Sequence, residues 1–277
     1  MRPYDLMRRM LATPTAWTPA ALAPKLWFDD QSGVTDAGSG TCSQWDDRSG
    51  NGWHFTQSDS VGRPLIVPAS LNGKRVLRFN GTSNRLSGPT GARSIFSGAT
   101  AAWMAVVVKK TQNDASPTSR RLFVATDNAE RARVGLYADD GTAGSANRIN
   151  YGGRRLDGGT YQAVRATQSV YDQWVMILGI TNYTARTVEL YRDGSLDASM
   201  ASAFDAAGSI SPSPSSTIDI GAAPIGNTAF GGDLAFAMAG TSILSTDDID
   251  KLFGHLAHRY GLAGSLPIGH PYKAGPP

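Results

Sequence analysis

Short segments that alternate apolar and polar residues, separated by Gly, Asn, Asp and Ser, follow one another through most of this chain. In KRVLRFN (74 to 80), Leu77 and Phe79 fall on one face and Arg78 and Asn80 on the other, which is the period of a half-buried β-strand. Comparable segments are 103–110, 121–127, 133–139, 147–153, 173–182, 187–194, 217–221 and 233–240. Asp193-Gly194 predicts a two-residue hairpin turn, so we expect antiparallel neighbours.

One segment near the C-terminus has a helical period instead. TDDIDKLFGHLAHRYG (246 to 261) places five apolar residues on one stripe: Ile249, Leu252, Phe253, Leu256 and Tyr260. Ser245 or Thr246 can cap its first turn, and Gly261 suits a left-handed C-terminal cap. A parallel α/β fold would need helices between its strands. The pattern therefore predicts an all-β, two-sheet antiparallel sandwich with one C-terminal amphipathic helix.

The pattern divides the chain into three parts. Residues 1–24 show no strand period and are predicted to be an arm or linker that docks on other proteins of an assembly, or on further copies of this chain in a homo-oligomer. Residues 25–262 are predicted to form one domain, because single β-sandwiches reach this length. Residues 263–277 contain four prolines, which remove backbone donors, and are predicted to form an extended strap.

Composition excludes several classes of protein. Hydrophobic residues make up 41% and charged residues 18% of the chain, which is enough for a packed core. The net charge of +3 is spread along the chain, so we expect no nucleic-acid partner. Cys42 is the only cysteine, so neither an intrachain disulfide nor a thiolate metal cluster can form. No stretch resembles a signal peptide or a membrane span, and we expect a protein that is made and folded in the cytosol.

Several motifs, taken in their order along the chain, resemble a known superfamily. They are LWFDD (26 to 30), WDDRSGNG (45 to 52), RVLRFNGTSNRL (75 to 86) and FGGDLAFAMAGTSILSTDDIDKL (230 to 252). Over residues 25 to 273 this order resembles the laminin-G-like branch of the concanavalin A-like lectin/glucanase superfamily, which implies a jelly roll. The ending LAHRYGL, then LPIGHPYK, is similar to that of many phage and prophage structural proteins. This second resemblance implies a place in a virion or phage-like particle.

The WDDRSGNG motif has two interpretations. As a turn, it points Trp45 inward, lets Asp47 accept hydrogen bonds from the amides that follow, and uses Asn51-Gly52 for positive φ. As a metal site, it offers Asp46, Asp47 and Asn51 as Ca²⁺ ligands. Three side chains fall short of the 6 to 8 oxygens that Ca²⁺ takes, so the turn is the favoured interpretation and no cofactor is required.

Catalysis of the kind found among enzymes of this superfamily is not expected. Retaining glycosidases need two carboxylates about 5 to 5.5 Å apart, and the enzymes that this chain resembles commonly carry them two residues apart on one strand. The whole chain has two glutamates, Glu130 and Glu189. His255 and His258 lack a carboxylate partner in the motif and are interpreted as surface residues, and there is no G-x-S-x-G motif.

The segment 147–174 is the candidate recognition site, because it mixes aromatic rings with guanidinium groups. Its candidate glycan-binding residues are Arg148, Tyr151, Arg154, Arg155, Tyr161 and Tyr171. Aromatic rings stack on sugars, and arginine binds carboxylates through two parallel hydrogen bonds. The alternative is a solvated loop whose tyrosines pack on neighbouring strands.

The sequence therefore predicts a non-catalytic carbohydrate-binding virion protein, a head or tail spike or fibre subunit that attaches to host surface polysaccharide. The alternative is a structural decoration protein that binds no glycan, and a glycoside hydrolase is disfavoured.

Overall fold

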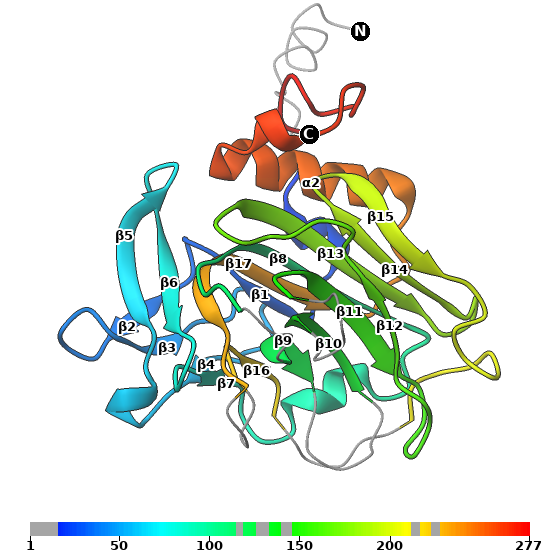
Figure 1. Ribbon diagram of the computed structural model, residues 1–277, viewed down its shortest axis with the longest axis horizontal. Coiled ribbons are helices and arrows are strands. Elements are labelled where there is room, and N and C mark those ends of the chain that lie inside the picture. Colours follow the sequence, from blue (N-terminus) through cyan, green and yellow to red (C-terminus); the bar gives the residue numbers. More distant parts are fainter. Residues whose placement is uncertain (1–15, 115–118, 126–132, 140–145, 212–216, 223–227) are drawn as a thin grey trace, which may run out of the picture.

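Two antiparallel β-sheets and one α-helix make up three layers in the part of the chain that the computed structural model describes, residues 16–114, 119–125, 133–139, 146–211, 217–222 and 228–277 (Figure 1). The helix lies on one face of the first sheet, and the second sheet lies against the other face. Every strand pair within the sheets is antiparallel. The prediction of an all-β sandwich with one late helix agrees with these layers.

The first sheet, sheet A, is the one that contacts the helix. Its spatial order is β15 (Ser195–Met200), β14 (Thr187–Arg192), β13 (Trp174–Asn182), β8 (Ala101–Lys110), β17 (Gly231–Gly240), β6 (Lys74–Asn80) and β5 (Leu65–Leu71). The short strand β1 (Leu26–Phe28) pairs with β17 beyond the end of β6, so both occupy one edge of β17.

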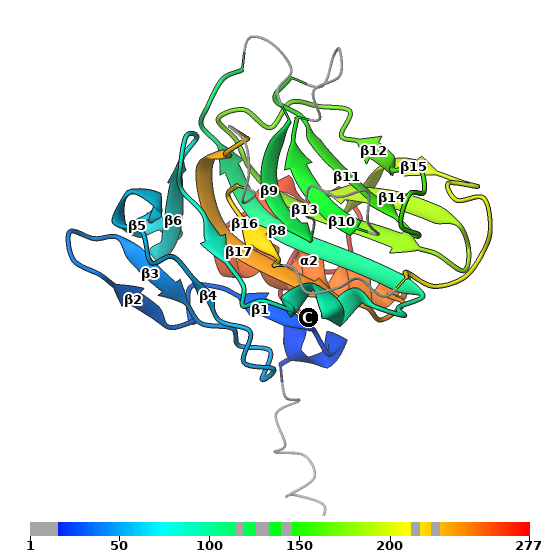
Figure 2. The ribbon, with the colours of Figure 1, turned by 90° about the horizontal axis from the view of Figure 1, so that it is seen from below.

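The second sheet, sheet B, lies on the side from which Figure 2 is viewed. Its spatial order is β12 (Gln162–Arg165), β11 (Ile149–Arg154), β10 (Arg133–Ala138), β9 (Arg120–Ala125), β16 (Asp219–Ile220), β7 (Leu86–Ser87), β4 (Phe55–Thr56), β3 (Cys42–Trp45) and β2 (Val34–Asp36). Four short 3-10 helices complete the described elements: η1 (Pro19–Leu22), η2 (Ser60–Gly62), η3 (Ala92–Phe96) and η4 (Ala263–Ser265).

Burial explains why the central strands of sheet A lack a clear alternation. All ten residues of β17 and nine of the ten in β8 are buried, because one face meets sheet B and the other meets the helix. Strands covered on both faces read as continuous apolar runs. In β6, by contrast, Leu77 and Phe79 are buried while Arg78 and Asn80 are exposed, as the alternation predicts.

The predicted hairpin at Asp193-Gly194 joins β14 to β15. Both residues have positive φ, 50° and 89°, which is the geometry of the turn that matches the twist of paired strands. The Asp193 carboxylate also accepts a hydrogen bond from the backbone N–H of Met176 at 2.9 Å, so the turn is attached to β13.

The core between the sheets contains many aromatic residues. The ring of Phe28 lies 5.2 Å from that of Trp45 and 4.7 Å from that of Phe55. These three residues join β1 of sheet A to β3 and β4 of sheet B. Trp45, the first residue of the WDDRSGNG motif, is therefore a core residue, as the turn interpretation expects.

The helix α2 spans Thr246–Tyr260 and is capped at both ends. The Ser245 hydroxyl accepts a hydrogen bond from the Asp248 N–H while the Asp248 carboxylate accepts one from the Ser245 N–H, and Gly261 ends the helix with φ of 72°. Its buried residues are Ile249, Leu252, Phe253, Gly254, Leu256, Ala257 and Tyr260. They pack on side chains of sheet A that point away from sheet B, among them Trp103, Met176 and Phe236.

The C-terminal residues lie against the outer side of α2 (Figure 1). The His258 Nε2 atom is 2.8 Å from the Tyr272 carbonyl oxygen, and a Cβ on Gly254 would lie 2.5 Å from the Cβ of Tyr272. Gly254 thus permits close contact between the helix and the tail. Among the described helices, none is long and apolar enough to cross a membrane.

Replacing Leu252 with Asp tests the packing of α2 on sheet A. Leu252 has no exposed surface, so the variant would bury a charge without a partner and lose at least about 3 kcal/mol of unfolding free energy. Urea denaturation measures the loss. Lys251→Gln is the control, since it removes only a surface ion pair with Asp247 and should cost less than about 1 kcal/mol. Equal stability of the two variants would contradict this packing.

Candidate functional site

The face of sheet B that points away from the core carries a cluster of arginine and tyrosine side chains, which we call the arginine face. Its residues are Arg85, Arg121, Arg133, Tyr137, Arg154, Tyr161, Arg165 and Asp219. Alternation along the strands puts them there: in β11, Ile149 and Tyr151 join the core, so Asn150 and Arg154 point the other way. Cross-strand pairing then aligns Arg154 with Arg133 and Tyr137 with Arg121 on that same face.

Tyrosine and arginine side chains stack on one another at the β10–β12 end of the arginine face. The Arg133 guanidinium lies 4.5 Å from the centre of the Tyr161 ring, and the rings of Tyr161 and Tyr137 meet edge to face at 6.1 Å. Burial raises the pKa of the Tyr161 hydroxyl well above its usual value, so this hydroxyl stays protonated. The stack fixes the Tyr161 ring and holds a cation beside it.

Asp219 is the centre of the other half of the arginine face. Its carboxylate accepts hydrogen bonds from Ser87 at 2.5 Å and Thr217 at 2.8 Å, and the Arg85 Nε atom lies 3.9 Å away. Burial raises the pKa of the Asp219 carboxyl, while these hydroxyls and the charges of Arg85 and Arg121 act in the opposite direction. The aspartate therefore offsets one of the surrounding positive charges.

The arginine face keeps hydrogen-bond donors that no described protein group satisfies. Arg121 Nε and Nη1 and Arg133 Nε are buried without a hydrogen-bond partner within the described residues. Arg133 stands directly opposite Arg154 on the neighbouring strand. An anionic group with several oxygens would satisfy the unpaired donors of Arg121 and Arg133.

The structure places two of the six predicted glycan-binding residues, Arg154 and Tyr161, on the arginine face. Arg148 precedes β11 and is half-buried near Asp139, whose carboxylate accepts a hydrogen bond from the Arg148 N–H at 3.2 Å. Tyr171 is exposed beside the end of β8. Arg155 follows β11 at its opposite end, where it lines a shallow depression of about 40 Å³ with Leu156 and Phe204. The six residues do not form one site.

The buried position of Tyr151 contradicts the prediction that its ring is available to a sugar. It has no exposed surface, lies in the core and donates a hydrogen bond from its hydroxyl to the Ala102 carbonyl at 2.9 Å. A Cβ on Gly179 would lie 2.1 Å from the Tyr151 ring, so this glycine of β13 makes room for it. Tyr151 belongs to the inward-facing residues of β11, and Arg154 belongs to the outward-facing ones.

The WDDRSGNG motif is a turn in this structure. Asp47 accepts hydrogen bonds from the backbone N–H groups of Trp27, Ser49 and Trp53 at 2.9 to 3.1 Å and from the Ser49 hydroxyl at 2.6 Å, so both carboxylate oxygens are engaged. The positive φ angles belong to Gly50 and Gly52, 87° and 75°. The expectation of positive φ at Asn51 is therefore wrong.

The proposed Ca²⁺ ligands of this motif are not brought together. Asp46 accepts a hydrogen bond from Gln44 at 2.7 Å, and the Asn51 amide donates to the carbonyls of Pro24 and Lys25. Over the described ranges, no three His, Cys, Asp or Glu side chains are placed to hold a metal ion.

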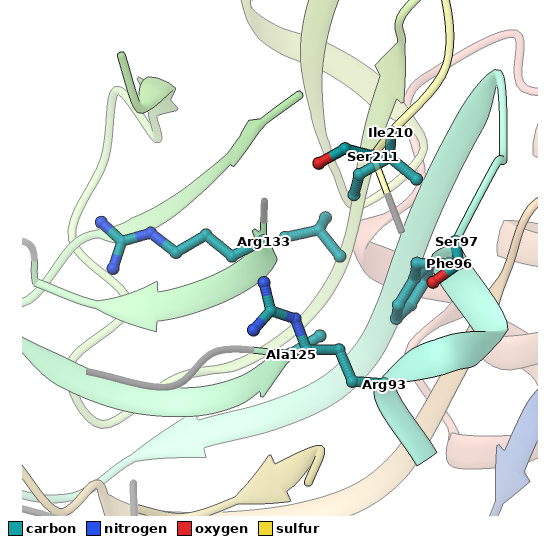
Figure 3. A pocket seen from close by; sticks show the side chains of 8 residues that line it. Arg93, Phe96, Ser97, Ala125, Arg133, Ile210 and Ser211 are labelled. Atoms are coloured by element: carbon teal, nitrogen blue, oxygen red, sulfur yellow. The ribbon is translucent and has the colours of Figure 1, made fainter. Parts of the chain in front are cut away.

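A crevice at the end of the β9–β10 hairpin adjoins the arginine face (Figure 3). Arg93 of η3 and Arg133 of β10 lie beside each other there, with Phe96, Ile210 and Ser211 opposite. Arg93 is only 2% exposed. The space between these side chains is too narrow for a water molecule, so the crevice offers no cavity for a ligand.

A buried ionic cluster joins the two sheets, and sequence reasoning missed it. Lys110 of β8 has no exposed surface, and its ammonium donates to Asp114 at 2.8 Å, to Asn147 at 2.7 Å and to the Gln112 carbonyl. The Asp139 carboxylate, at the end of β10, lies 3.8 Å from the same ammonium. The sequence signal for this ionic cluster is a lysine at the end of an otherwise apolar strand.

The two histidines of α2 take part in packing and are not free surface residues. The ring of His255 lies 5.9 Å from that of Trp17, and burial lowers the pKa of His255 to about 4. His258 contacts the C-terminal tail, as described above.

Tyr151→Ala tests the assignment of this residue to the core. Loss of a buried aromatic ring should cost about 3–5 kcal/mol of unfolding free energy. Tyr171→Ala is the matched control, since Tyr171 is 38% exposed, and it should cost less than about 1 kcal/mol. Urea denaturation compares the two, and a Tyr151 variant as stable as the Tyr171 variant would return Tyr151 to the candidate site.

Asp139→Asn tests the ionic cluster through pH. Burial raises the pKa of Asp139 to about 7, although Lys110 acts in the opposite direction, whereas an unfolded Asp has a pKa near 3.9. The contribution of the protonated Asp139 carboxyl to the free energy of unfolding is therefore complete below about pH 4 and is lost as the pH rises to 7. Between pH 4.5 and 7, the free energy of unfolding of the natural protein should fall relative to that of the variant, by up to about 1.4 kcal/mol per pH unit.

Equilibrium unfolding of both proteins across this range measures the difference. Burial acts to raise the pKa of the neighbouring Asp114, but hydrogen bonds with Arg120, Lys110 and Asp139 outweigh it and lower this pKa, so Asp114 titrates below the window. Parallel pH curves for the two proteins would show that Asp139 is ionised throughout.

Comparisons with known proteins concern the fold. No protein-family model matches the chain, and no curated protein matches its sequence. Among solved structures, the binding domain of Paraclostridial Mosquitocidal Protein 1 superposes with a TM-score of 0.60 and 13% identity over 84% of this chain and 52% of that one. A structure described as showing that cell entry of botulinum neurotoxin type C depends on interaction with two ganglioside molecules gives 0.57 and 12%, over 83% of this chain and 50% of the other.

A third similar structure matches in length as well. Domain 4 of AbnA, an extracellular arabinanase from Geobacillus stearothermophilus, in complex with arabinotriose, has a TM-score of 0.56 and 13% identity over 82% of this chain and 96% of the domain. The chain spans about half the length of the toxin binding domains, with 52% and 50% covered. At these identities the likeness is one of fold alone, which this chain shares with the three structures over the matched parts.

Proposed function

We propose that the protein is a non-catalytic carbohydrate-binding protein whose arginine face binds an acidic polysaccharide. The observation that carries the proposal is the set of buried, unsatisfied donors of Arg121 and Arg133 beside the stacked ring of Tyr161. Guanidinium donors bind the carboxylate or phosphate of an acidic sugar, and a fixed aromatic ring offers a face for the sugar ring.

The similar structures support a sugar as the ligand. The AbnA domain is described in complex with arabinotriose, and botulinum neurotoxin type C as interacting with gangliosides. The described carboxylates give little support to hydrolysis. Asp219 is held by Ser87, Thr217 and Arg85, and Glu130 lies outside the described residues.

The setting in which the protein acts is also part of the proposal. We infer a jelly-roll spike or fibre subunit of a phage or phage-like particle, made in the bacterial cytoplasm, with the amphipathic α2 inside the domain of residues 25–262 and the strap of residues 263–277 following it. The support is the resemblance of the sequence motifs and of the chain ending. Residues 1–24 would attach this subunit to other virion proteins or to copies of itself, and residues 1–15 of this arm lie outside the described residues.

Binding to purified, acidic bacterial capsule polysaccharide tests the function. At 50 mM NaCl the protein should bind, and the affinity should fall between 50 and 500 mM because salt screens the long-range attraction between a polyanion and the positive charges of the arginine face. Arg121→Gln and Arg133→Gln should each weaken binding about tenfold or more, as loss of a charged hydrogen bond does. Biolayer interferometry measures the affinity, and a reducing-sugar assay should detect no cleavage.

Lys251→Gln is the charge-matched control, because it removes one positive charge from α2 on the other side of the molecule and should leave binding unchanged. If Lys251→Gln lost as much affinity as the arginine variants, the effect of those variants would be explained by net charge alone. Binding that both arginine variants retain would move the site elsewhere. No binding to any acidic host polysaccharide would favour the alternative of a structural decoration protein.

A further inference from the structure

A cavity of about 260 Å³ lies on the opposite side of the molecule, between the outer face of sheet A and the residues around the start of α2. Its polar wall comes from Asn182 of β13 and from Thr187, Glu189 and Tyr191 of β14. Its apolar wall includes Ile180 and Ile243. We call it the helix-side pocket.

Strand register explains why these side chains share one face. Thr187, Glu189 and Tyr191 alternate along β14, so they point to the same side. Asn182 pairs with Thr187 and Ile180 pairs with Glu189 across the β13–β14 ladder, which puts each pair within contact distance. Ile243, in the loop before α2, is 64% exposed and forms the rim opposite these strands.

The polar wall offers acceptors and donors side by side. Tyr191 donates from its hydroxyl to Glu189 Oε2 at 3.1 Å, which leaves the hydroxyl oxygen as an acceptor. Burial and the nearby Glu189 raise the pKa of Tyr191 to about 12, so this direction of donation holds at neutral pH. Asn182 Oδ1 accepts a hydrogen bond from the Ala185 N–H at 2.8 Å, which leaves the Asn182 amide NH₂ group as a donor.

The pocket carries the negative charge of Glu189, which has no cationic partner among the described residues. No Lys, Arg or His of the described residues lies within ion-pair distance of Glu189. An anionic ligand would be repelled by this carboxylate. An ammonium group would satisfy Glu189 but would meet the donor side of Asn182. A hydroxyl group both donates and accepts, so it suits Glu189, Thr187 and Asn182 together.

We propose that the helix-side pocket is a second carbohydrate-binding site, which takes a single neutral pyranose residue. Glu189 and Asn182 bind adjacent hydroxyls, and the aliphatic wall with Ile180 and Ile243 packs on the apolar C–H face of the ring. The cavity is smaller than the roughly 300–1,000 Å³ of pockets for drug-sized ligands, which suits one sugar ring. This site differs from the arginine face in position and charge, and it does not depend on the function proposed for that face.

Saturation-transfer NMR with the methyl glycosides of glucose, galactose, mannose and N-acetylglucosamine tests the proposal on the whole chain. At least one glycoside should bind, with an affinity that is unchanged between 50 and 500 mM NaCl because no ion pair forms. Glu189→Gln, which keeps the shape of the side chain, should weaken binding about tenfold, as loss of a charged hydrogen bond does. Thr187→Val, which removes only the hydroxyl, should weaken it less, by about threefold.

Two controls separate this site from the arginine face. Arg121→Gln should leave binding of the neutral glycoside unchanged, and Glu189→Gln should leave binding of acidic polysaccharide unchanged. Thermal melting identifies any variant that fails to fold, and Thr187→Val then serves in place of Glu189→Gln.

Three results would overturn the proposal. They are no binding of any of the four glycosides, equal binding by the natural protein and both pocket variants, and loss of glycoside binding in Arg121→Gln instead. Propylammonium chloride is the competing probe. Binding of this cation in place of every glycoside would also overturn the proposal, since the pocket would then recognise an amine.

Discussion

Burial of sheet A on both faces is the constraint on which the rest of the structure depends. Strands β8 and β17 lie at its centre, and their side chains pack on sheet B in one direction and on α2 in the other. A strand buried on both faces must be apolar throughout, and AAWMAVVVKK and GGDLAFAMAG meet that requirement. Without α2, residues such as Trp103 and Phe236 would face water, so the helix is part of the core of this fold.

This arrangement decides which surfaces remain for recognition. The helix and the C-terminal tail cover the middle of sheet A, so its polar outer residues remain open at the margin, on β13 and β14. In the part of the chain that the structure describes, no α-helix covers the outer face of sheet B, which holds the arginine face. The two candidate sites thus lie on opposite sides of the sandwich and have opposite charge. A cationic face suits an acidic polysaccharide, and a pocket with one carboxylate suits a neutral sugar.

The Lys110 cluster shows how the two sheets are tied by more than apolar contact. Lys110 ends β8 in sheet A, and Asp139 and Asn147 adjoin β10 and β11 in sheet B. A buried ammonium is tolerated only where oxygens surround it, and this requirement fixes the loops at that end of the sandwich. The same strands, β10 and β11, carry the arginine face, so the cluster helps to hold the arginine side chains in register.

Local pattern was sufficient to predict the elements of this protein. Three patterns each arise within a few residues: the alternation in KRVLRFN, the turn at Asp193-Gly194 and the helical stripe from Ile249 to Tyr260. The sequence alone therefore determined which segments form strands and which segment forms the helix α2. It also pointed to Asp47 as the acceptor of a turn, because that hydrogen bonding is local.

The site could not be predicted in the same way, because it depends on the phase and register of strands far apart in the chain. Alternation shows that Tyr151 and Arg154 face opposite sides of β11, but only the packing of sheet A decides which side is the core. Arg85, Arg121 and Asp219 approach one another through pairing of β7, β9 and β16, which no spacing along the chain reveals. The sequence determined which residues form strands, and the tertiary structure decided which of their faces points inward and which points outward, because burial of one face is a property of the whole sandwich.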